Sequence, residues 1–475
     1  MRICMILEGC YPYVRGGVSS WMHEYIQGMP EHEFVLWVIG AKAEDKGKFK
    51  YELPRNVAEI HEVFLDDALR LRPTGKEKLR FTPEQVTALR QLLACEAPDW
   101  EVLFDTYNVK KTGVLSFLMS EEFLNILLEM CREKYPYIAF SELFHTVRSM
   151  LLPLLYLIQQ EVPRADVYHA TSTGYGGLLG ALAGWRYHRP FILTEHGIYT
   201  REREEEILRA QWVASYFKQH WINLFYMLAR CSYDAAVRVT ALFSRYSEIQ
   251  GELGCEAYKR RVIANGIHCE KFIHIPLKPE DDFVDIGAVV RIAPIKDIKT
   301  LIYAFLELKT RVPQARLHVL GDTDDEEYRQ ECVDLIAQLE VRDLYLVGNT
   351  NVSEYLKKLD FTVLSSISEG QPLAVLESLA ARRPCVTTDV GCCRDLLEGT
   401  SYDAFGRAGL CEPPMHPQAL ADAMELLCIR RDLRLEMGEV GQKRILTQFV
   451  HEDMIRRYLE NYREVMDAWQ ALDSN

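Results

Sequence analysis

The stretch Ser368-Glu369-Gly370-Gln371-Pro372-Leu373-Ala374-Val375-Leu376-Glu377 decides how this chain is interpreted. A strand-like run, residues 360–366, leads into it, and a helix-like run, residues 373–381, leads out. This order predicts that Glu369 lies in a loop at the carboxyl end of a strand and that Glu377 lies inside the next helix. Ligands of open α/β sheets bind at this edge, where helix N–H groups favour an anion. The loop therefore suits a phosphorylated ligand rich in hydroxyls, such as a nucleotide-sugar. The alternative is a helix cap followed by a solvated glutamate.

Apolar strand-like runs alternate with helical runs in both halves of the chain. The runs in the first half are 3–7, 34–39, 58–63, 166–169, 191–194, 235–240 and 262–264. Those in the second half are 284–290, 316–320, 344–347, 361–364 and 385–388. Short apolar runs between helices are typical of parallel strands buried on both faces. The pattern predicts an α/β fold of two doubly wound, Rossmann-like domains.

The predicted domains are residues 1–270 and 283–449, separated by a polar segment with two prolines near 272–282. Residues 450–475 should form a helix that packs back on the first domain. The first half is too long for a minimal α/β domain, and its excess, residues 66–162, is helical in pattern. This helical insertion would shape an acceptor site, bind a partner or simply elaborate the structure.

Composition limits the classes of function. The chain has 475 residues, 48% of them hydrophobic, and a net charge of −14, which argues against a nucleic acid partner because phosphate binding needs a concentrated basic surface. The 13 cysteines show no paired metal spacing, and we expect reduced thiols. No secretory signal is recognisable, and the apolar run 150–158 is too short to span a bilayer. We expect a cytoplasmic protein, with recruitment to the inner face of the membrane by partners left open.

Two basic residues follow the first strand of the second half. Arg291 is expected at the carboxyl end of that strand, and Lys296 just before a helix that begins near Asp297. Two cations at a helix N-terminus would clamp a diphosphate and stabilise its charge as it departs. The alternative is a surface pair of cations with Asp297 as helix cap.

The first half offers weaker signals. Gly16-Gly17 precede a probable helix and would let a phosphate or sugar approach the backbone closely, although a simple turn also explains them. His196 follows a strand and would hydrogen-bond a sugar or serve the fold. Asn265-Gly266 is predicted to form a turn, with a hinge as the alternative. We interpret Asp322-Thr323-Asp324 as helix capping and not as a metal site.

Together these segments resemble retaining glycosyltransferases of family 4, which have the GT-B fold: two Rossmann-like domains facing a cleft. The resemblance rests on Gly16-Gly17, Glu195-His196, residues 264–267, Arg291 with Lys296-Asp297, and Glu369 with Glu377, all in family order. The opening segment 8–21 and the long insertion resemble the PelF group, which acts in Pel exopolysaccharide synthesis. Gln371 stands where the family has phenylalanine, which leaves the donor sugar open.

The resemblance implies a set of roles. Catalytic residues would be His196, Glu369, Arg291 and Lys296. The donor would be held by the following residues: Gly16, Gly17, Arg291, Lys296, Glu369, Gly370, Gln371, Pro372, Leu373 and Glu377. Among these, Glu377 would bind the ribose hydroxyls, and the N–H groups of Gly370 and Gln371 would hold the sugar.

The function expected from the resemblance is transfer of a hexose or N-acetylhexosamine from a UDP-sugar to a growing polysaccharide, with retained configuration. No cofactor and no metal are expected, because the UDP-sugar is a substrate. Partners would be the UDP-sugar, the polysaccharide acceptor and subunits of a membrane synthase complex. Two alternatives remain: a non-catalytic GT-B subunit of such a complex, and a nucleotide-sugar epimerase. The sequence does not indicate the sugar, the linkage or the oligomeric state.

Overall fold

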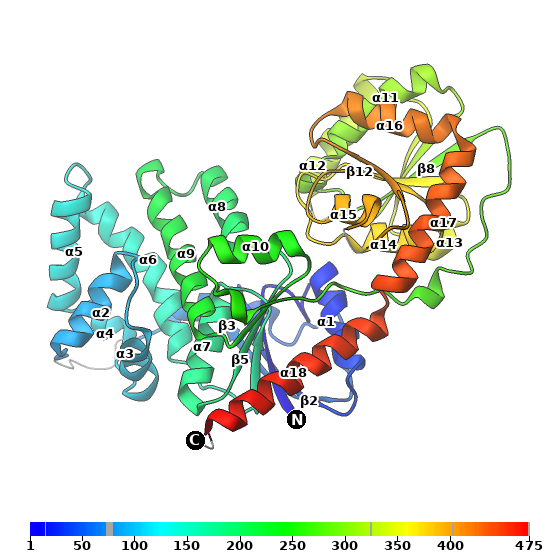
Figure 1. The fold of residues 1–475 in the computed structure, drawn as a ribbon. Helices are drawn as coiled ribbons and strands as arrows, with labels where there is room; N and C mark the ends of the chain where they lie inside the picture. Colours follow the sequence, from blue (N-terminus) through cyan, green and yellow to red (C-terminus); the bar gives the residue numbers. More distant parts are fainter. Residues whose placement is uncertain (15, 73–78, 324, 401–402, 474–475) are drawn as a thin grey trace. The chain divides into compact units, whose positions relative to one another are not determined.

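The computed structural model describes residues 1–14, 16–72, 79–323, 325–400 and 403–473 (Figure 1). The chain forms two compact units. Unit 1 comprises Met1–Val262 with Leu459–Asn475, and unit 2 comprises Ile263–Tyr458. The chain therefore passes between the units twice. The first crossing follows Val262, before residue 270, where we predicted the first domain to end.

Unit 1 is built on a sheet of seven parallel strands in the order β3-β2-β1-β4-β5-β6-β7. Their bounds are β1 Arg2–Glu8, β2 Glu33–Gly40, β3 Val57–Phe64, β4 Val167–Ala170, β5 Phe191–Glu195, β6 Arg238–Ala241 and β7 Arg260–Val262. The central strands are buried throughout, as in β4 and β5. Such strands have no polar face because helices cover both sides of a parallel sheet.

Helices connect these strands. Those of unit 1 are α1 Gly17–Gln27, α2 Pro83–Leu93, α3 Trp100–Phe104, α4 Val114–Leu118, α5 Glu121–Lys134, α6 Phe140–Ile158, α7 Tyr175–Tyr187, α8 Tyr199–Arg209, α9 Lys218–Ala235 and α10 Ser244–Glu252. Helices α2 to α6 stand between β3 and β4, where the helical insertion was predicted. Thr82 starts α2 with a capping box in which Thr82 and Gln85 satisfy each other's backbone N–H groups.

Unit 2 has a six-stranded parallel sheet in the order β10-β9-β8-β11-β12-β13. The strands are β8 Val284–Val289, β9 Ala315–Leu320, β10 Leu344–Gly348, β11 Phe361–Leu364, β12 Cys385–Thr388 and β13 Gly409–Glu412. The helices are α11 Ile298–Arg311, α12 Glu326–Gln338, α13 Val352–Leu356, α14 Leu373–Ala380, α15 Cys393–Glu398, α16 Pro417–Ile429, α17 Arg431–Gln448 and α18 His451–Asp473. Two Rossmann-like parallel sheets confirm the predicted fold class, whereas β13 and α15 were not predicted.

The end of α18 belongs to unit 1, and a buried hydrogen-bond chain joins it to the sheet. Tyr25 donates to the hydroxyl of Tyr462 over 2.8 Å, and that hydroxyl lies 2.6 Å from Nδ1 of His169 on β4. Burial lowers the pKa of His169 to about 3, so its imidazole is neutral. A neutral imidazole donates from one nitrogen and accepts at the other, so His169 bonds both to Tyr462 and, through Nε2 at 2.7 Å, to the hydroxyl of Thr194 on β5.

A buried ionic network fixes the proline-containing segment to the amino edge of the unit 2 sheet. Asp285, near the start of β8, accepts two hydrogen bonds from Arg316, of 2.6 and 2.7 Å. Lys278, from the proline segment, lies 2.7 Å from Asp285 and 3.1 Å from Asp360. His318 lies 2.9 Å from Asp285. Because Asp285 is only 3% exposed, these partners compensate for its loss of water.

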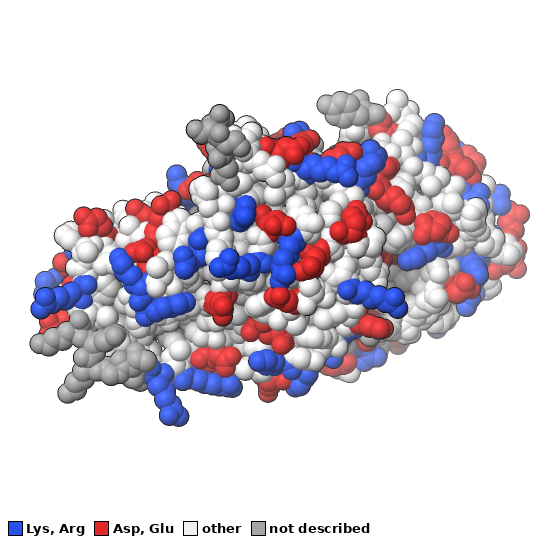
Figure 2. Space-filling view, turned by 90° about the horizontal axis from the view of Figure 1, so that it is seen from below, with Lys and Arg blue, Asp and Glu red and all other residues white. Residues whose placement is uncertain are grey.

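Acidic and basic side chains are interspersed over the face that Figure 2 shows. Within the part of the chain that the structure describes, no helix has both the length and the apolarity to cross a membrane.

Candidate functional site

The carboxyl edge of the unit 2 sheet contains a topological switch point. Strand β8 lies between β9 and β11, and the chain proceeds outward in opposite directions on its two sides. In open α/β sheets, such a point leaves a crevice at the carboxyl ends of the strands, where ligands bind. Arg291 and Lys296 follow β8, and the loop with Glu369 follows β11. The sequence-predicted residues therefore flank this point.

Lys296 and Glu369 form an ion pair across the switch point. Nζ of Lys296 donates to Oε1 of Glu369 over 2.5 Å, and Ser366 donates to the same oxygen over 2.6 Å. The side chains are only 19% and 10% exposed, so solvent screens the pair weakly. Ser365 donates to the backbone carbonyl of Lys296 over 2.9 Å, which holds the two loops together.

A second backbone segment supports the loop that carries Glu369. The N–H of Cys392 donates to the carbonyl of Gly370 over 3.1 Å. At Gly391, which has φ +57°, a Cβ would lie 2.2 Å from the oxygen of Gly370 and 2.4 Å from that of Glu369. Both the backbone conformation and the close approach therefore require glycine there. We had not recognised this support from the sequence.

Gln371 makes side-chain contacts that the sequence did not predict. Its side chain is 7% exposed and faces Asn265, not open space. Oε1 accepts from the N–H of Asn265 over 2.7 Å, and Nε2 donates to the carbonyl of Asn265 over 3.3 Å. Its backbone N–H remains, with that of Gly370, a candidate for donor binding.

Arg291 is exposed and borders a pocket of about 180 Å³. Val289, Leu320 and Val352 give this pocket apolar walls, and Asn349 and Thr350 add polar groups. These walls come from the carboxyl ends of β8 and β9 and from the start of α13. An apolar slot with a few polar groups suits a planar base, a feature that the sequence pattern did not predict.

Helix α14 starts at the loop that carries Glu369. Pro372 is its N-cap and makes no side-chain hydrogen bond to the first turn, which also lacks an acidic residue. Leu373 begins the helix, and Glu377 lies half-buried in its second turn. The positive end of the helix dipole is thus not compensated from within the first turn and favours an anion.

The switch point of unit 1, between β1 and β4, is already occupied by a carboxylate. Glu8, at the end of β1, accepts from the backbone N–H of Gly176 over 3.0 Å and from Ser172 over 3.2 Å. The hydroxyl of Tyr199 donates to its other oxygen over 2.7 Å. Glu8 therefore takes the position of an anion at the N-terminus of α7.

Helix α1 has a more accessible N-terminus. Gly16 is its N-cap and Gly17 its first residue, and the first turn contains no acidic residue. A Cβ added to either glycine would meet nothing within 4 Å. Packing therefore does not explain the glycine pair, and the predicted approach of a ligand stays a prediction.

His196 follows β5 and packs edge-to-face against Trp21 of α1, with ring centroids 4.3 Å apart. Its Nε2 is buried and has no hydrogen-bond partner among the described residues. Burial lowers the pKa of His196 to about 4, so the imidazole is neutral near pH 7. The predicted contact of His196 with a sugar hydroxyl stays a prediction, because its unused nitrogen is closed off from solvent.

The neighbouring Glu195 is a second unusual group, to which the sequence analysis assigned no role. It is 1% exposed and accepts from Tyr233 over 2.7 Å and from Gln250 over 3.0 Å. Burial raises its pKa to about 7, although these hydrogen bonds oppose the rise. Glu195 therefore fixes the end of β5 beside His196.

The acidic loop after β9 behaves as a helix start. Asp325 is the N-cap of α12 and accepts from the N–H of Tyr328 over 2.9 Å. Asp322 accepts from the N–H of Thr323 over 3.0 Å, and Asp324 lies outside the described residues. Asp297 likewise caps α11 by accepting from Thr300.

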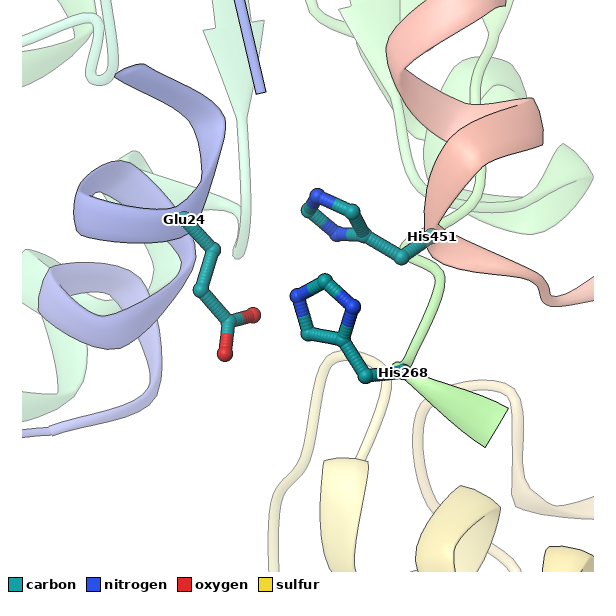
Figure 3. Close-up of side chains that lie close together, drawn as sticks. All are labelled: Glu24, His268 and His451. Carbon is teal, nitrogen blue, oxygen red and sulfur yellow. The ribbon is translucent and has the colours of Figure 1, made fainter. Parts of the chain in front are cut away.

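A separate group in unit 2 has ligand atoms close enough to hold a cation. His268 Nδ1 lies 3.4 Å from Glu270 and 3.8 Å from Glu452. The ring of His451 lies beside that of His268 at an angle of 33°, with ring centroids 4.1 Å apart (Figure 3). Both glutamates are more than half exposed, as in an ordinary surface ion pair. None of these residues comes from the loop that carries Glu369.

Residues 1–258 match the family described as "Domain of unknown function (DUF3492)", which is more than half of the chain. The chain belongs to the DUF3492 family. In this DUF3492 protein, residues 270–444 also match the family described as "Glycosyl transferases group 1". That second match covers the sheet with the Lys296–Glu369 pair.

Curated relatives of the DUF3492 protein are distant. It is 28% identical over 176 residues to "N-acetyl-alpha-D-glucosaminyl L-malate synthase" of Bacillus anthracis, covering 36% of this chain and 43% of that protein. It is 26% identical over 272 residues to "UDP-Gal:alpha-D-GlcNAc-diphosphoundecaprenol alpha-1,3-galactosyltransferase" of Escherichia coli, covering 54% and 65%. The matched parts thus span less than two thirds of either relative.

Among solved structures, Anabaena Alr3699/HepE in complex with UDP has a TM-score of 0.62 at 14% identity. The match covers 98% of this chain and 100% of that one. Sucrose-phosphate synthase from Thermosynechococcus elongatus has a TM-score of 0.59 at 16% identity, covering 98% of this chain and 99% of that one. At such identities the likeness shows the fold, which is the GT-B fold that we predicted.

Proposed function

We propose that the protein is a retaining, metal-independent glycosyltransferase that moves a hexose or N-acetylhexosamine from a UDP-sugar to a growing polysaccharide. The observation that carries the proposal is the Lys296–Glu369 pair, which joins the ends of β8 and β11 at the switch point. A cation for a diphosphate and a carboxylate for sugar hydroxyls thus stand side by side. The match of residues 270–444 to group 1 glycosyl transferases supports it.

In this proposal the donor lies along the carboxyl edge of unit 2. The base enters the pocket beside Arg291, and Glu377 accepts hydrogen bonds from the ribose hydroxyls. Arg291 and Lys296 bind the diphosphate, with the N-terminus of α14 behind it. Glu369 and the N–H groups of Gly370 and Gln371 hold the sugar. The two cations take over the charge neutralisation that a metal ion would otherwise supply.

The reaction would proceed on one face of the sugar. The acceptor oxygen forms a bond to the anomeric carbon as the bond from that carbon to the diphosphate breaks. The acceptor proton passes to the departing phosphate oxygen. Configuration is retained because the acceptor attacks the face of the sugar from which the diphosphate departs. Negative charge grows on the diphosphate in the transition state, and Arg291 and Lys296 stabilise that charge. His196, as a neutral imidazole, would position a sugar hydroxyl, and Gly16 and Gly17 would approach the donor.

We further propose that the PelF group contains functional relatives of this protein, with Pel-type exopolysaccharide as the product. The basis is the opening segment 8–21 and the helical insertion of α2 to α6. The enzyme would work on the cytoplasmic side of the membrane, recruited by synthase subunits, and contribute to biofilm formation.

The decisive experiment offers the purified chain a panel of nucleoside diphosphate sugars with and without EDTA. We expect calorimetry to detect UDP binding, and product analysis by NMR to show an α-linked sugar from an α-linked donor. EDTA should leave the rate unchanged. An inverted product or loss of rate in EDTA would contradict the retaining, metal-independent assignment.

The same panel separates the two alternatives. A non-catalytic GT-B subunit would show no nucleotide binding and no thermal stabilisation by UDP. An epimerase would convert one UDP-sugar into another without an acceptor. Either result would overturn the proposed transferase.

A further inference from the structure

The side chain of Gln371 connects the loop of Glu369 to the segment where the chain enters unit 2. Its amide makes two hydrogen bonds to the backbone of one residue, Asn265, through the N–H at 2.7 Å and the carbonyl at 3.3 Å. This is the pairing that a neighbouring β-strand would provide. Gln371 and Asn265 are 7% and 5% exposed, so water does not compete for these bonds.

The segment after Asn265 is joined in turn to the segment where the chain leaves unit 2. Ile267 forms a parallel bridge with Val450, with its N–H donating to Phe449 over 2.9 Å and its carbonyl accepting from His451 over 3.0 Å. At Gly266, a Cβ would lie 2.4 Å from the carbonyl oxygen of Val450. The two passages of the chain between the units are therefore bonded side by side within unit 2.

We infer that Gln371 is a positioning residue that couples occupancy of the donor loop to residues 263–267 and, through Ile267, to the start of α18. The inference rests on the proposed function, because Glu369 and Gly370 directly precede Gln371. A ligand that fixes this loop also fixes the Gln371 amide, and that amide holds Asn265. The coupling needs a side chain that both donates and accepts at this reach, which glutamine supplies and phenylalanine does not.

Hydrogen exchange followed by mass spectrometry tests the coupling directly. In the wild type, we expect a UDP-sugar to slow exchange in peptides covering 365–372 and also in peptides covering 263–267. In Gln371→Leu, which keeps the volume and removes both hydrogen bonds, the first region should still be protected by ligand. The second should lose its ligand-dependent protection and, even without ligand, exchange faster at Asn265.

Gln442→Leu is the matched control. Gln442 also donates from a half-buried amide to two backbone carbonyls of unit 2, those of Ala380 at 2.7 Å and Ile273 at 3.4 Å. It lies at the opposite end of α14 from the donor loop. We expect Gln442→Leu to lower the thermal stability as much as Gln371→Leu does, but to leave the ligand-dependent protection of 263–267 unchanged.

Kinetics give a second readout that a purely structural role would not change. Gln371→Leu should reduce kcat for sugar transfer about tenfold while the Kd for UDP changes little, because the nucleotide contacts other residues. Gln371→Glu keeps an acceptor for the N–H of Asn265 and regains a donor only when protonated. Its kcat relative to wild type should therefore rise as the pH falls from 8 to 5.

The outcomes separate the inference from the proposed function. If wild type binds no UDP-sugar, the proposed function and the inference both fail. If ligand protects 365–372 but not 263–267 in wild type, the inference is overturned and the transferase remains. Equal behaviour of the Gln371→Leu and Gln442→Leu variants would likewise assign Gln371 a structural role only.

Discussion

Nζ of Lys296 lies 2.5 Å from Oε1 of Glu369, and this contact joins the loops that follow β8 and β11. The two residues are 73 positions apart in the chain, yet adjacent strands of one sheet deliver them to the same edge. Without ligand, the carboxylate neutralises the cation that we propose for the diphosphate. A donor that binds both groups would replace one internal contact with two contacts to the ligand.

Replacing Lys296 by methionine should weaken UDP binding. Loss of one charge-assisted hydrogen bond, worth roughly 1.5–3 kcal/mol, corresponds to about tenfold to a hundredfold in Kd. Calorimetry with UDP measures this. Lys299→Met is the control, since Lys299 pairs with Glu331 on the neighbouring α12 and has no proposed ligand contact. Equal affinities of the Lys296→Met variant and the wild type would contradict the assignment.

Glu369→Gln should slow sugar transfer without weakening the binding of UDP. The amide keeps the shape but releases Lys296 from its ion pair, so UDP should bind at least as tightly as to wild type. Transfer of the sugar should fall about tenfold or more, because the carboxylate no longer accepts from sugar hydroxyls. Parallel measurement of the Kd for UDP and of kcat checks this. A loss of UDP affinity as large as that in Lys296→Met would refute the separation of roles.

Glu377→Gln should reduce UDP affinity about tenfold through the ribose hydroxyls. The discriminating ligand is 2′,3′-dideoxyuridine diphosphate, which wild type should bind more weakly than UDP. The variant should bind both ligands equally, because the group that distinguishes them is gone. Glu439→Gln, on an exposed residue paired with Arg382, serves as control. If the variant loses as much affinity on removal of the ribose hydroxyls as wild type does, Glu377 does not contact the ribose.

Glu195 should make unit 1 less stable as the pH rises. Its folded pKa of about 7 lies above the ordinary value of 4.5, so the folded state binds the proton more tightly. The contribution of Glu195 to the free energy of unfolding is therefore greatest below about pH 4.5. It falls by about 3 kcal/mol in total as the pH rises to about 7. Glu195→Gln can donate to Thr173 and accept from Tyr233, so it fits the same contacts.

Calorimetric unfolding of both proteins between pH 5 and pH 8 measures this effect. Glu195→Gln should unfold at a higher temperature than wild type at pH 8, and the difference should shrink toward pH 5. A difference that is constant across this range would show that Glu195 is ionised throughout.

Asp285→Asn should destabilise unit 2. Burial raises the pKa of Asp285, but hydrogen bonds from His318, Arg316 and Lys278 outweigh it and hold the pKa well below its usual range. The stabilisation is therefore present above about pH 4 and is lost as the pH falls below it. Removing one member of a buried ion network costs about 3–5 kcal/mol.

Hydrogen exchange of peptides from β8 and β9 at pH 7 reports this loss. Asp432→Asn, on an exposed residue paired with Arg430, should change stability by less than about 0.5 kcal/mol. If Asp285→Asn were as mild as Asp432→Asn, the network would not support the sheet.

Local patterns predicted the fold and part of the site. The apolar runs of β1, β2 and β8 are long enough to identify buried strands, and Lys296 and Glu369 lie in the loops that follow β8 and β11. Strand β13, Gly409–Glu412, begins with glycine and ends with glutamate, so it contains no continuous apolar run. The sequence also could not predict the partner of Gln371, because a contact between residues 371 and 265 depends on how two loops that are distant in the chain pack together. Gly391 shows the same limit, since its need for glycine arises from the backbone of residues 369 and 370.

The hydrogen-bond chain from Tyr25 through Tyr462 to His169 means that the last residues of the sequence complete the core of unit 1. A fragment ending at Val262 would leave these buried polar atoms without Tyr462. Anyone who wishes to express unit 1 separately should therefore fuse residues 459–473 to it through a short linker. A tag or fusion partner should be added after the fused residues 459–473 and should not replace them.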